Sequence, residues 1–293
     1  MPAGSPFTLL CQQLAVHQDR GRADLHLHSI YSDGLFTPPE IVQRAMHAGL
    51  FAIALTDHDT LSGHEPTLQA ARAAGSTLEV IPGVEITCEY AGRELHLLAY
   101  FVRPTDAALC VALEYLRQKR FERYHALAER LRGRGLSIED AAIQSGTVNG
   151  GTLGRRHLAQ LLVETRQVRT TFEAFSRYLC DPELTALPKG RLAVAEAITL
   201  VKNAGGISSW AHPPSDVTME QIRDLQAVGL DAVEAVYPWA KPSHGRRLRA
   251  IAEELGLGVT GGSDCHGPQP NHRAIGSRTI NRLELDLLRR RLE

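Results

Sequence analysis

Hydrophobic and polar positions follow two different periods along most of this 293-residue chain. Short, nearly continuous apolar runs indicate buried strands, and several stretches between them place apolar residues three or four positions apart, as amphipathic helices do. We expect strands at residues 23–28, 51–56, 80–87, 94–102, 206–211, 231–237 and 257–262. We expect helices at residues 38–48, 65–74, 193–203, 219–228 and 244–255. This alternation predicts a parallel sheet, and about seven such units predict an α/β barrel or near-barrel.

One connection in this pattern is too short for a parallel crossover. Between Glu85 and His96 the chain offers only a turn around Ala91 and Gly92, whereas parallel strands need a connection of about a dozen residues or more. The third and fourth strands are therefore predicted to form an antiparallel hairpin. A turn at this position would place Glu85 and His96 roughly opposite each other.

Residues 103–190 break the alternation, because their pattern is helical. A long helix is predicted at 105–132, followed by shorter helices at 155–165 and 171–179. The buried stripe of the long helix is expected to consist of Leu109, Leu113, Leu116, Leu127 and Leu131. We therefore expect four segments, namely an N-terminal extension at 1–21, the first part of the barrel at 22–102, a helical insertion subdomain at 103–190 and the second part of the barrel at 191–293.

The composition is that of an ordinary globular protein, with 43% hydrophobic and 22% charged residues. A net charge of −1 provides no global basic field for nucleic acid or a membrane surface, and no apolar run is long enough to span a bilayer. The five cysteines are widely spaced and include no CxxC pair, which argues against a disulfide framework and a cysteine zinc site. We expect a cytoplasmic protein with no membrane partner, and no protein partner can be inferred.

Nine residues that make good metal ligands stand mostly where a predicted strand ends. They are His26, His28, Asp33, His58, Glu85, His96, His212, Asp264 and His266. Imidazoles and carboxylates without a thiolate cluster favour Zn, Mn or Fe in a catalytic site over a closed structural site. Because the carboxyl ends of barrel strands line one mouth, these residues are predicted to converge in a multinuclear hydrolytic centre.

Spacing within the strands adds geometry to this prediction. His26 and His28 are two residues apart on a strand, so both side chains point to the same face. Asp264 and His266 are expected to repeat this arrangement at the last strand. A single histidine is more often structural than a ligand, but nine ligand types in this arrangement favour a metal centre.

The runs DLHLHSIYSDG, ALTDHDT, IPGVEI, WAHP and GGSDCHG occur in this order along the chain. Together they closely resemble the motifs of the PHP (polymerase and histidinol phosphatase) family. The insertion, in which Arg155, Arg156 and His157 precede an apolar helix, resembles one branch of that family. This branch contains nucleoside 3′,5′-bisphosphate phosphatases that also act as 5′-to-3′ exoribonucleases on short RNA.

The resemblance implies a distorted (β/α)7 barrel that holds two or three divalent ions, with Mn favoured and Zn or Fe as alternatives. Carried over by motif, the first ion would be bound by His26, His28, Glu85 and Asp264, the second by Glu85, His96 and His212, and the third by Asp33, His58 and His266. The residues expected to take part in catalysis are Asp33, His58, Glu85, His212, Asp264 and His266. Closely spaced ions activate a bridging water as hydroxide, bind phosphate oxygens and stabilise the leaving oxygen.

Candidate substrate contacts lie mainly in the insertion. Arg155 and His157 are predicted to bind phosphate, and Arg156 is a weaker candidate. Asp59 is a further candidate beside the metal ligands; with Asp57 it would orient them, or else it caps a helix that begins at residue 60. The basic residues Arg117, Lys119, Arg120 and Arg123 are interpreted as a solvated helix face in preference to an RNA track.

One position departs from the branch that the chain resembles. Glu183 and Ala186 stand where that branch usually carries a lysine and a tyrosine. If those positions contact the substrate, Glu183 would repel a phosphate.

The sequence therefore predicts a metal-dependent phosphoesterase whose substrate is a small phosphorylated compound such as a nucleotide, or short single-stranded RNA or DNA. Nucleoside 3′,5′-bisphosphates and the 5′ ends of short RNA are the leading substrates. The alternatives are a phosphatase for another small metabolite, such as histidinol phosphate, and a non-catalytic module that binds metal or nucleic acid.

Overall fold

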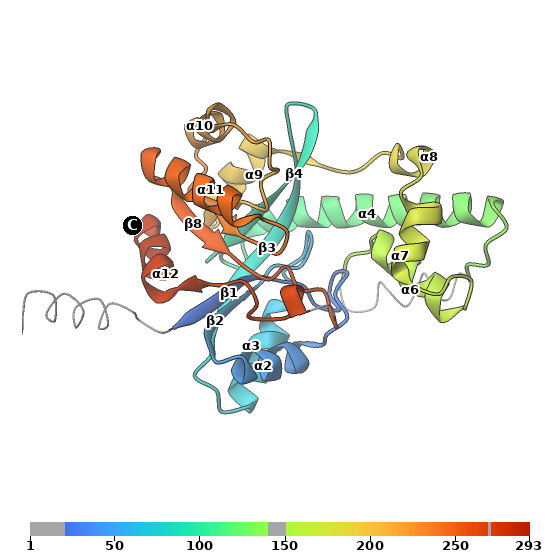
Figure 1. The fold of residues 1–293 in the computed structure, drawn as a ribbon, viewed down its shortest axis with the longest axis horizontal. Helices are drawn as coiled ribbons and strands as arrows, with labels where there is room; N and C mark the ends of the chain where they lie inside the picture. The colour runs from blue at the N-terminus through green and yellow to red at the C-terminus, as the bar shows by residue number, and fades with distance from the viewer. Residues whose placement is uncertain (1–20, 140–150, 269–270) are drawn as a thin grey trace, which may run out of the picture.

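A nearly closed sheet forms the centre of the molecule, in a computed structural model that describes residues 21–139, 151–268 and 271–293 (Figure 1). Within these ranges the strands follow the order β8-β7-β6-β4-β3-β2-β1-β9, and β5 pairs with β3. The strands are β1 Arg22–Leu27, β2 Leu50–Leu55, β3 Glu79–Tyr90, β4 Arg93–Tyr100, β5 Leu192–Ala193, β6 Ile207–Trp210, β7 Ala232–Val236, β8 Gly258–Gly261 and β9 Ile280–Asn281. The predicted α/β barrel is confirmed.

The predicted hairpin is also confirmed. Strand β4 runs antiparallel to both β3 and β6, while β1, β2 and β3 are mutually parallel, as are β6, β7 and β8. In the hairpin His96 is paired with Thr87, and Glu85 is paired with Leu98. Glu85 and His96 are therefore diagonal neighbours on one face, two positions from the directly opposed pair that the turn suggested.

The barrel closes between β1 and the segment that follows β8. Leu27 and Cys265 form a parallel bridge there, and the backbone N–H of His28 donates to the carbonyl of Cys265 over 3.0 Å. The buried Asp24 carboxylate accepts from the backbone N–H of Ser263 at 2.9 Å, and burial raises the pKa of Asp24 to about 6. This closure joins the first and last metal-ligand segments of the sequence.

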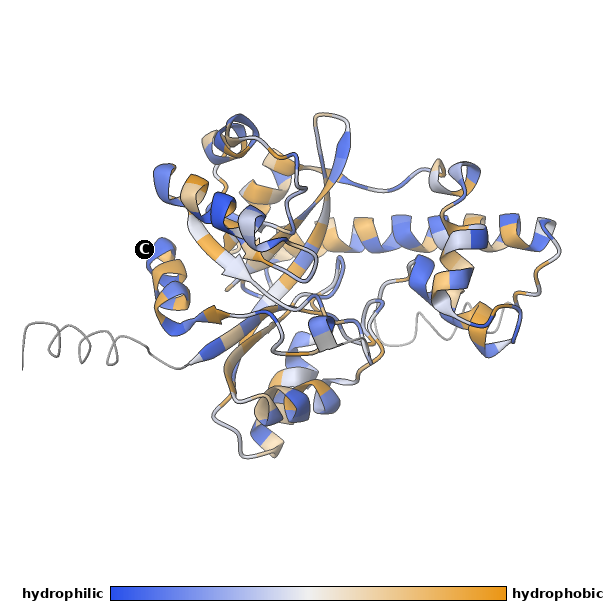
Figure 2. Ribbon diagram, viewed as in Figure 1, coloured by the Kyte–Doolittle hydropathy of each residue, from blue (hydrophilic) through white to orange (hydrophobic). Residues whose placement is uncertain are grey.

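Helices cover the sheet, and those expected from the sequence are present with boundaries shifted by a few residues (Figure 2). Around the barrel they are α2 Pro38–His47, α3 His64–Ala73, α9 Val194–Asn203, α10 Met219–Ala227, α11 Pro242–Glu254, the short η2 Asn271–Arg273, α12 Arg282–Arg289 and the short η3 Arg290–Leu292. The insertion contributes α4 Ala107–Gly133, α6 Arg155–Glu164, α7 Thr171–Ala174, the π-helical turn η1 Phe175–Leu179 and α8 Pro182–Thr185.

Helix α4 connects two hydrophobic cores. Its first half packs Leu109, Leu113 and Leu116 into the barrel core, and its second half packs Leu127 and Leu131 into a separate core of the insertion. All five residues of the predicted stripe are buried. Figure 1 shows α4 extending away from the sheet toward α6, α7 and α8. A side chain on the middle of this helix can therefore reach the space between barrel and insertion.

The exact limits of the four expected segments stay a prediction. The extension at 1–21 lies outside the described residues except for Gly21, and so does most of the glycine-rich stretch at 146–151.

The close approach of Gly262 to β1 gives a test of the barrel closure. A Cβ at Gly262 would lie 2.3 Å from the backbone nitrogen of His26, so Gly262→Ala forces the backbone apart. We expect a loss of about 1–3 kcal/mol in the free energy of unfolding, measured by urea titration. Gly133→Ala is the matched control, because a Cβ there meets no atom of the described residues within 4 Å. Equal stability of the two variants would contradict the packing described.

Candidate metal centre

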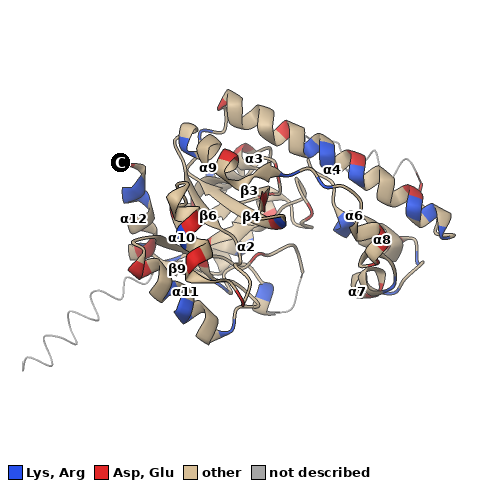
Figure 3. Ribbon diagram, turned by 90° about the horizontal axis from the view of Figure 1, so that it is seen from above, with Lys and Arg blue, Asp and Glu red and all other residues tan. Residues whose placement is uncertain are grey.

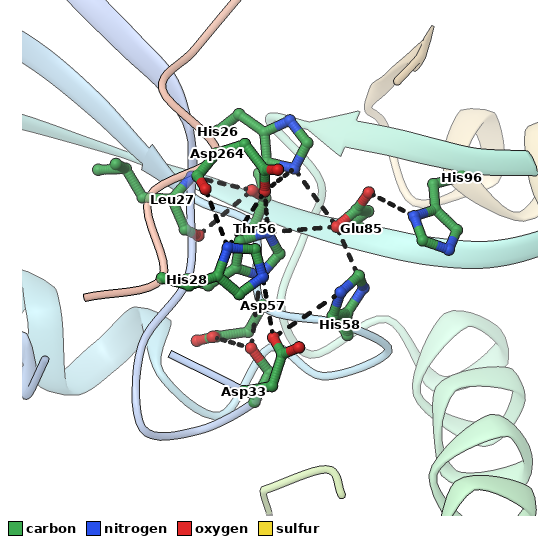
Figure 4. Close-up of polar contacts among 12 residues, drawn as sticks. His26, Leu27, His28, Asp33, Thr56, Asp57, His58, Glu85, His96 and Asp264 are labelled. Carbon is green, nitrogen blue, oxygen red and sulfur yellow. Dashed lines mark hydrogen bonds and ion pairs between the residues drawn. The ribbon is translucent and has the colours of Figure 1, made fainter. Parts of the chain in front are cut away.

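The nine predicted ligands converge at the mouth of the barrel. Figure 4 shows His26, His28, Asp33, His58, Glu85, His96 and Asp264 facing one another. His26 lies within β1, while His28, His58 and His212 follow the ends of β1, β2 and β6. The expectation that ligands follow strand ends does not hold for Glu85 and His96, which lie inside β3 and β4. These two long strands continue past the barrel as a hairpin, so their middle residues lie level with the ends of the other strands.

Glu85 lies at the centre of this cluster and is 1% exposed. Its Oε2 atom is 3.3 Å from Nε2 of both His26 and His28, and 3.1 Å from Nδ1 of His58. Its Oε1 atom is 2.7 Å from Nδ1 of His96 and 3.1 Å from Nε2 of His212. Because the two oxygens face different rings, the carboxylate has the geometry to bridge two ions.

Asp33 organises a second part of the cluster. Its Oδ1 atom is 3.1 Å from Nε2 of His266 and 3.8 Å from Nε2 of His58. His28, Asp33, His58 and His266 offer ligand atoms within 4.8 Å of one another. The two ring nitrogens of His58 therefore face different groups, with Nδ1 toward Glu85 and Nε2 toward Asp33.

Asp264 and His266 reach the cluster from a loop. Strand β8 ends at Gly261, and Asp264 has a positive φ of 46°, so the expected repeat of the strand geometry is wrong. Asp264 Oδ1 still lies 3.1 Å from Nε2 of His28 and 3.5 Å from Nε2 of His26. The left-handed backbone turns this carboxylate back over β1, and such conformations are typical of functional sites.

The cluster fits bound cations, as its unpaired atoms show. The Nδ1 atom of His26 donates to Glu234 Oε1 at 3.0 Å, and the Nδ1 atom of His266 donates to the carbonyl of Asp264 at 2.9 Å. When these rings are neutral, the Nε2 atom of each therefore carries a lone pair and no proton. These lone pairs face carboxylate oxygens, which donate nothing. Among the described residues, the buried atoms without a hydrogen-bond partner include His26 Nε2, His28 Nε2, Asp33 Oδ1, His58 Nδ1 and Glu85 Oε2. Cations would satisfy them together.

Charge coupling within the cluster is strong. Burial alone would lower the pKa of His28, but contacts with Asp264 and Glu85 outweigh it and raise the pKa to about 9. Burial likewise opposes the effect of Glu85 on His96, whose pKa rises to about 9. Burial would raise the pKa of Glu85, yet the surrounding rings hold it well below its usual range. Without cations the site takes up protons, and bound cations would displace them.

Two buried carboxylates support the ligands from behind. Glu234, in the middle of β7, accepts from Nδ1 of His26 and, at 2.6 Å, from the backbone N–H of His212. Asp57 accepts from the backbone N–H and hydroxyl of Ser29 and from the hydroxyl of Ser32. Asp57 thereby holds the loop after β1, as its expected orienting role requires. Glu234 was missed by the sequence reasoning, although a lone carboxylate within an apolar strand is a usable signal.

Asp59 does not cap a helix. Helix α3 begins at His64 with Gly63 as its N-cap, so the capping alternative is wrong. The buried Asp59 carboxylate instead accepts from the backbone N–H and hydroxyl of Thr87, each at 2.7 Å, and from Nε of Arg120. Its position fixes the Arg120 guanidinium beside the metal centre.

A cavity of about 390 Å³ opens onto Asp33, His58 and His96. We call it the cationic cavity, because its lining includes Lys119, Arg120, Arg123, Arg155, Arg156, Lys189 and Arg273. The interpretation of the run 117–123 as a solvated face is therefore wrong for Arg120 and Arg123, whereas Lys119 reaches the cavity edge and also pairs with Glu122 on the exposed side of α4. It holds for Arg117, which forms an ion pair with Glu114 on the exposed side of α4. Figure 3 shows acidic and basic residues interspersed along this helix.

Positive charge in the cationic cavity exceeds the negative charge that faces it. Lys189 is paired with Glu94 at 2.6 Å, but the guanidinium of Arg123 is hydrogen-bonded to the carbonyl of Leu187 and that of Arg155 to a carbonyl of the insertion. Burial and the neighbouring charges of Arg155 and Arg120 lower the pKa of Arg123 to about 10. Arg123 Nη2 is also buried with no hydrogen-bond partner in the described ranges. These features indicate an anion-binding site.

The other predicted substrate contacts lie in different positions. His157 accepts from the backbone N–H of Gly154 at 3.0 Å and lines a neighbouring cavity on the Asp33 side. Glu183 is exposed and paired with Arg134 at 3.1 Å, and it is absent from the described lining of the cationic cavity. The expected repulsion between Glu183 and a phosphate therefore has no structural basis there. Lys189, which the sequence reasoning missed, lines the cavity instead.

The motifs, the barrel and the histidine–carboxylate cluster agree with the comparisons to known proteins. A model of the PHP domain matches residues 24–171. The chain belongs to the PHP domain family. It is 30% identical over 254 residues to the 5′-3′ exoribonuclease Rnm of Escherichia coli, covering 84% of this chain and 86% of that protein. It is 28% identical over 262 residues to a 3′,5′-nucleoside bisphosphate phosphatase of Chromobacterium violaceum, covering 86% and 90%.

A solved structure supports the same family. A protein from Bifidobacterium adolescentis, described as a metal-dependent phosphoesterase, aligns with a TM-score of 0.82 and 29% identity over 92% of this chain and 96% of that one. This PHP protein is accordingly a metal-dependent phosphoesterase. In the described ranges, no helix is both long and apolar enough to cross a membrane.

Glu234 gives a test of how the cluster is positioned. Glu234→Gln keeps the shape of the side chain but presents an amide group to one of its two N–H donors. We expect metal affinity, measured by chelator competition, to fall by about 10–100-fold, as is typical when a residue that orients metal ligands is changed. Glu89→Gln is the control, because Glu89 is exposed and pairs with Arg191 at the surface. Unchanged affinity in Glu234→Gln would show that Glu234 does not position His26 and His212.

Proposed function

We propose that this PHP protein hydrolyses nucleoside 3′,5′-bisphosphates and removes nucleotides from the 5′ ends of short RNA. The observation that carries this proposal is the buried guanidinium nitrogen of Arg123, which has no hydrogen-bond partner among the described residues and lies in a cavity that opens onto the metal ligands. A substrate with two phosphates would place one phosphate at the cluster and the other against Arg123 and Arg155. The relatives named as an exoribonuclease and a bisphosphate phosphatase act on compounds of this chemistry.

The metal cluster would take the reacting phosphate. We propose two or three divalent ions held by the nine converging residues, with Mn favoured and Zn or Fe as alternatives for a mixed imidazole–carboxylate set. Such ions lower the pKa of a coordinated water and neutralise phosphate oxygens. In this proposal Glu85 bridges two positions, with His96 and His212 on its Oε1 side. Asp33, His58 and His266 form the third.

The protein's own cations would bind and orient the second phosphate. Arg123 and Arg155 are the proposed direct contacts, since guanidinium groups pair bidentately with phosphate oxygens. Asp59 acts through Arg120, whose guanidinium it holds in place. His157 is proposed to contact the nucleoside from the cavity on the Asp33 side. The free cysteines among the described residues support a cytoplasmic location for this reaction.

Two alternatives are less well supported. A phosphatase for a small monophosphate, such as histidinol phosphate, would leave Arg123 and Arg155 without an anion. A non-catalytic module would not require a complete set of nine metal-ligand side chains beside an open cavity.

Arg123→Gln separates these proposals. We expect kcat/KM for adenosine 3′,5′-bisphosphate to fall by about tenfold or more, since a buried charged hydrogen bond contributes about 1.5–3 kcal/mol. Hydrolysis of 3′-AMP and of histidinol phosphate should change little, because neither has a second phosphate. Phosphate release is measured for all three with Mn²⁺. The control is Arg117→Gln, on the same helix but outside the cationic cavity. An equal loss on all three substrates would contradict the assigned role of Arg123.

A further inference from the structure

We infer that a second cavity beside the metal centre receives the downstream nucleotide of an RNA substrate; this inference rests on the proposed function. We call it the downstream cavity. Its volume is about 580 Å³, and its lining includes Tyr90, Arg93, His96, Trp210, His212 and Asp216. It lies between the β3–β4 hairpin and the segment that leads from β6 to α10.

The downstream cavity meets the cationic cavity at the metal centre. Glu94 and His96 line both cavities, and His212 lines the downstream one. The rings of His96 and His212 both contact Oε1 of Glu85, at 2.7 and 3.1 Å. A phosphate bound beside this oxygen would therefore have one cavity on each side of it.

A phosphodiester needs both cavities, whereas a phosphomonoester needs one. The first nucleotide of a 5′-phosphorylated RNA carries the same two phosphates as a bisphosphate, except that its 3′ phosphate bears a further ester to the next nucleotide. In hydrolysis, water adds to this phosphorus and the bond from phosphorus to O3′ of the first nucleotide breaks. The O3′ oxygen takes the proton that the water loses. The phosphate remains on the downstream chain, which must lie outside the cationic cavity.

The lining of the downstream cavity suits a nucleotide. The partly exposed ring of Tyr90 supplies aromatic surface on which bases of any sequence can pack, and the edge of the buried Trp210 forms part of the wall behind it. Arg93 is exposed at the hairpin and offers positive charge to a following phosphate, while the exposed Asp216 offers negative charge. These two residues oppose each other in their effect on a polyanion, and neither is assigned to the hydrolysis of a bisphosphate.

The cavity on the Asp33 side is better placed for the first nucleotide. It measures about 760 Å³ and shares Arg156 and Phe175 with the cationic cavity. It therefore continues from the place where the second phosphate would bind. A base attached to that phosphate through its ribose would occupy it, and the downstream chain would be left to the other side.

Two charge changes test the inference. Arg93→Glu should lower kcat/KM for a 5′-phosphorylated RNA tetranucleotide by about threefold to tenfold, and Asp216→Lys should raise it by a similar factor, as for exposed charges that contact phosphates. Both variants should hydrolyse adenosine 3′,5′-bisphosphate within about twofold of the unaltered protein. The control is Arg246→Glu, which reverses an exposed charge on α11, away from the cavity lining given for the described residues.

Binding provides a readout that does not depend on turnover. The dissociation constant of the same tetranucleotide is measured by fluorescence anisotropy in the presence of chelator. It should rise in Arg93→Glu, which binds RNA more weakly, and fall in Asp216→Lys, which binds it more tightly. The inference is overturned if both variants match Arg246→Glu on RNA, or if they alter bisphosphate and RNA hydrolysis equally. Absence of bisphosphate and RNA hydrolysis in the unaltered protein would instead refute the proposed function.

Discussion

The buried carboxylate of Glu85, surrounded by five imidazole rings, is the interaction on which the rest of the structure depends. A carboxylate that is 1% exposed costs several kcal/mol to remove from water unless positive charge compensates it. Protons on His26, His28 and His96, whose pKa values lie above the usual range, provide that charge in the absence of metal, and cations provide it when they are bound. The nearly closed barrel brings these rings together, since they come from β1, β4 and the segments that follow β1, β2 and β6.

Hydrogen bonds from neighbouring segments hold the metal ligands close together in spite of the backbone strain that this arrangement requires. The left-handed backbone of His212 and Asp264 is unfavourable for non-glycine residues, and hydrogen bonds to neighbouring segments maintain it. Glu234 secures the backbone N–H of His212, and the bridge between Leu27 and Cys265 secures the loop of Asp264. The cationic cavity also brings unfavourable neighbours together, because helix α4 presents the positive charges of Arg120 and Arg123 to the same cavity. Both arrangements give up stability and gain the capacity to bind phosphate.

Local spacing was enough to predict part of this site. The two-residue period of a strand places His26 and His28 on one face, and the short turn after Tyr90 brings Glu85 near His96. Both are consequences of backbone geometry within one or two elements. The positions of the other ligands near strand ends predicted that they would converge as well. The family motifs added only the expected grouping of the nine ligands into separate ions, which strand spacing alone could not give.

Features that depend on packing between distant segments could not be predicted in this way. Asp264 and His266 reach the cluster through a turn whose positive φ has no clear sequence signal. Arg123 was interpreted as solvated because its helix has charged residues on several sides, and only the docking of the insertion buries it. The position of Lys189 in the cavity lining likewise depends on the path of the chain as it leaves the insertion and re-enters the barrel.

Metal content, measured after reconstitution with Mn²⁺ and removal of unbound ions, tests the central claim most directly. The account predicts two or three ions per chain in the unaltered protein. It predicts at least one ion fewer in Glu85→Gln, because the bridging carboxylate is lost. One ion or none in the unaltered protein, or an equal number in the two proteins, would contradict it.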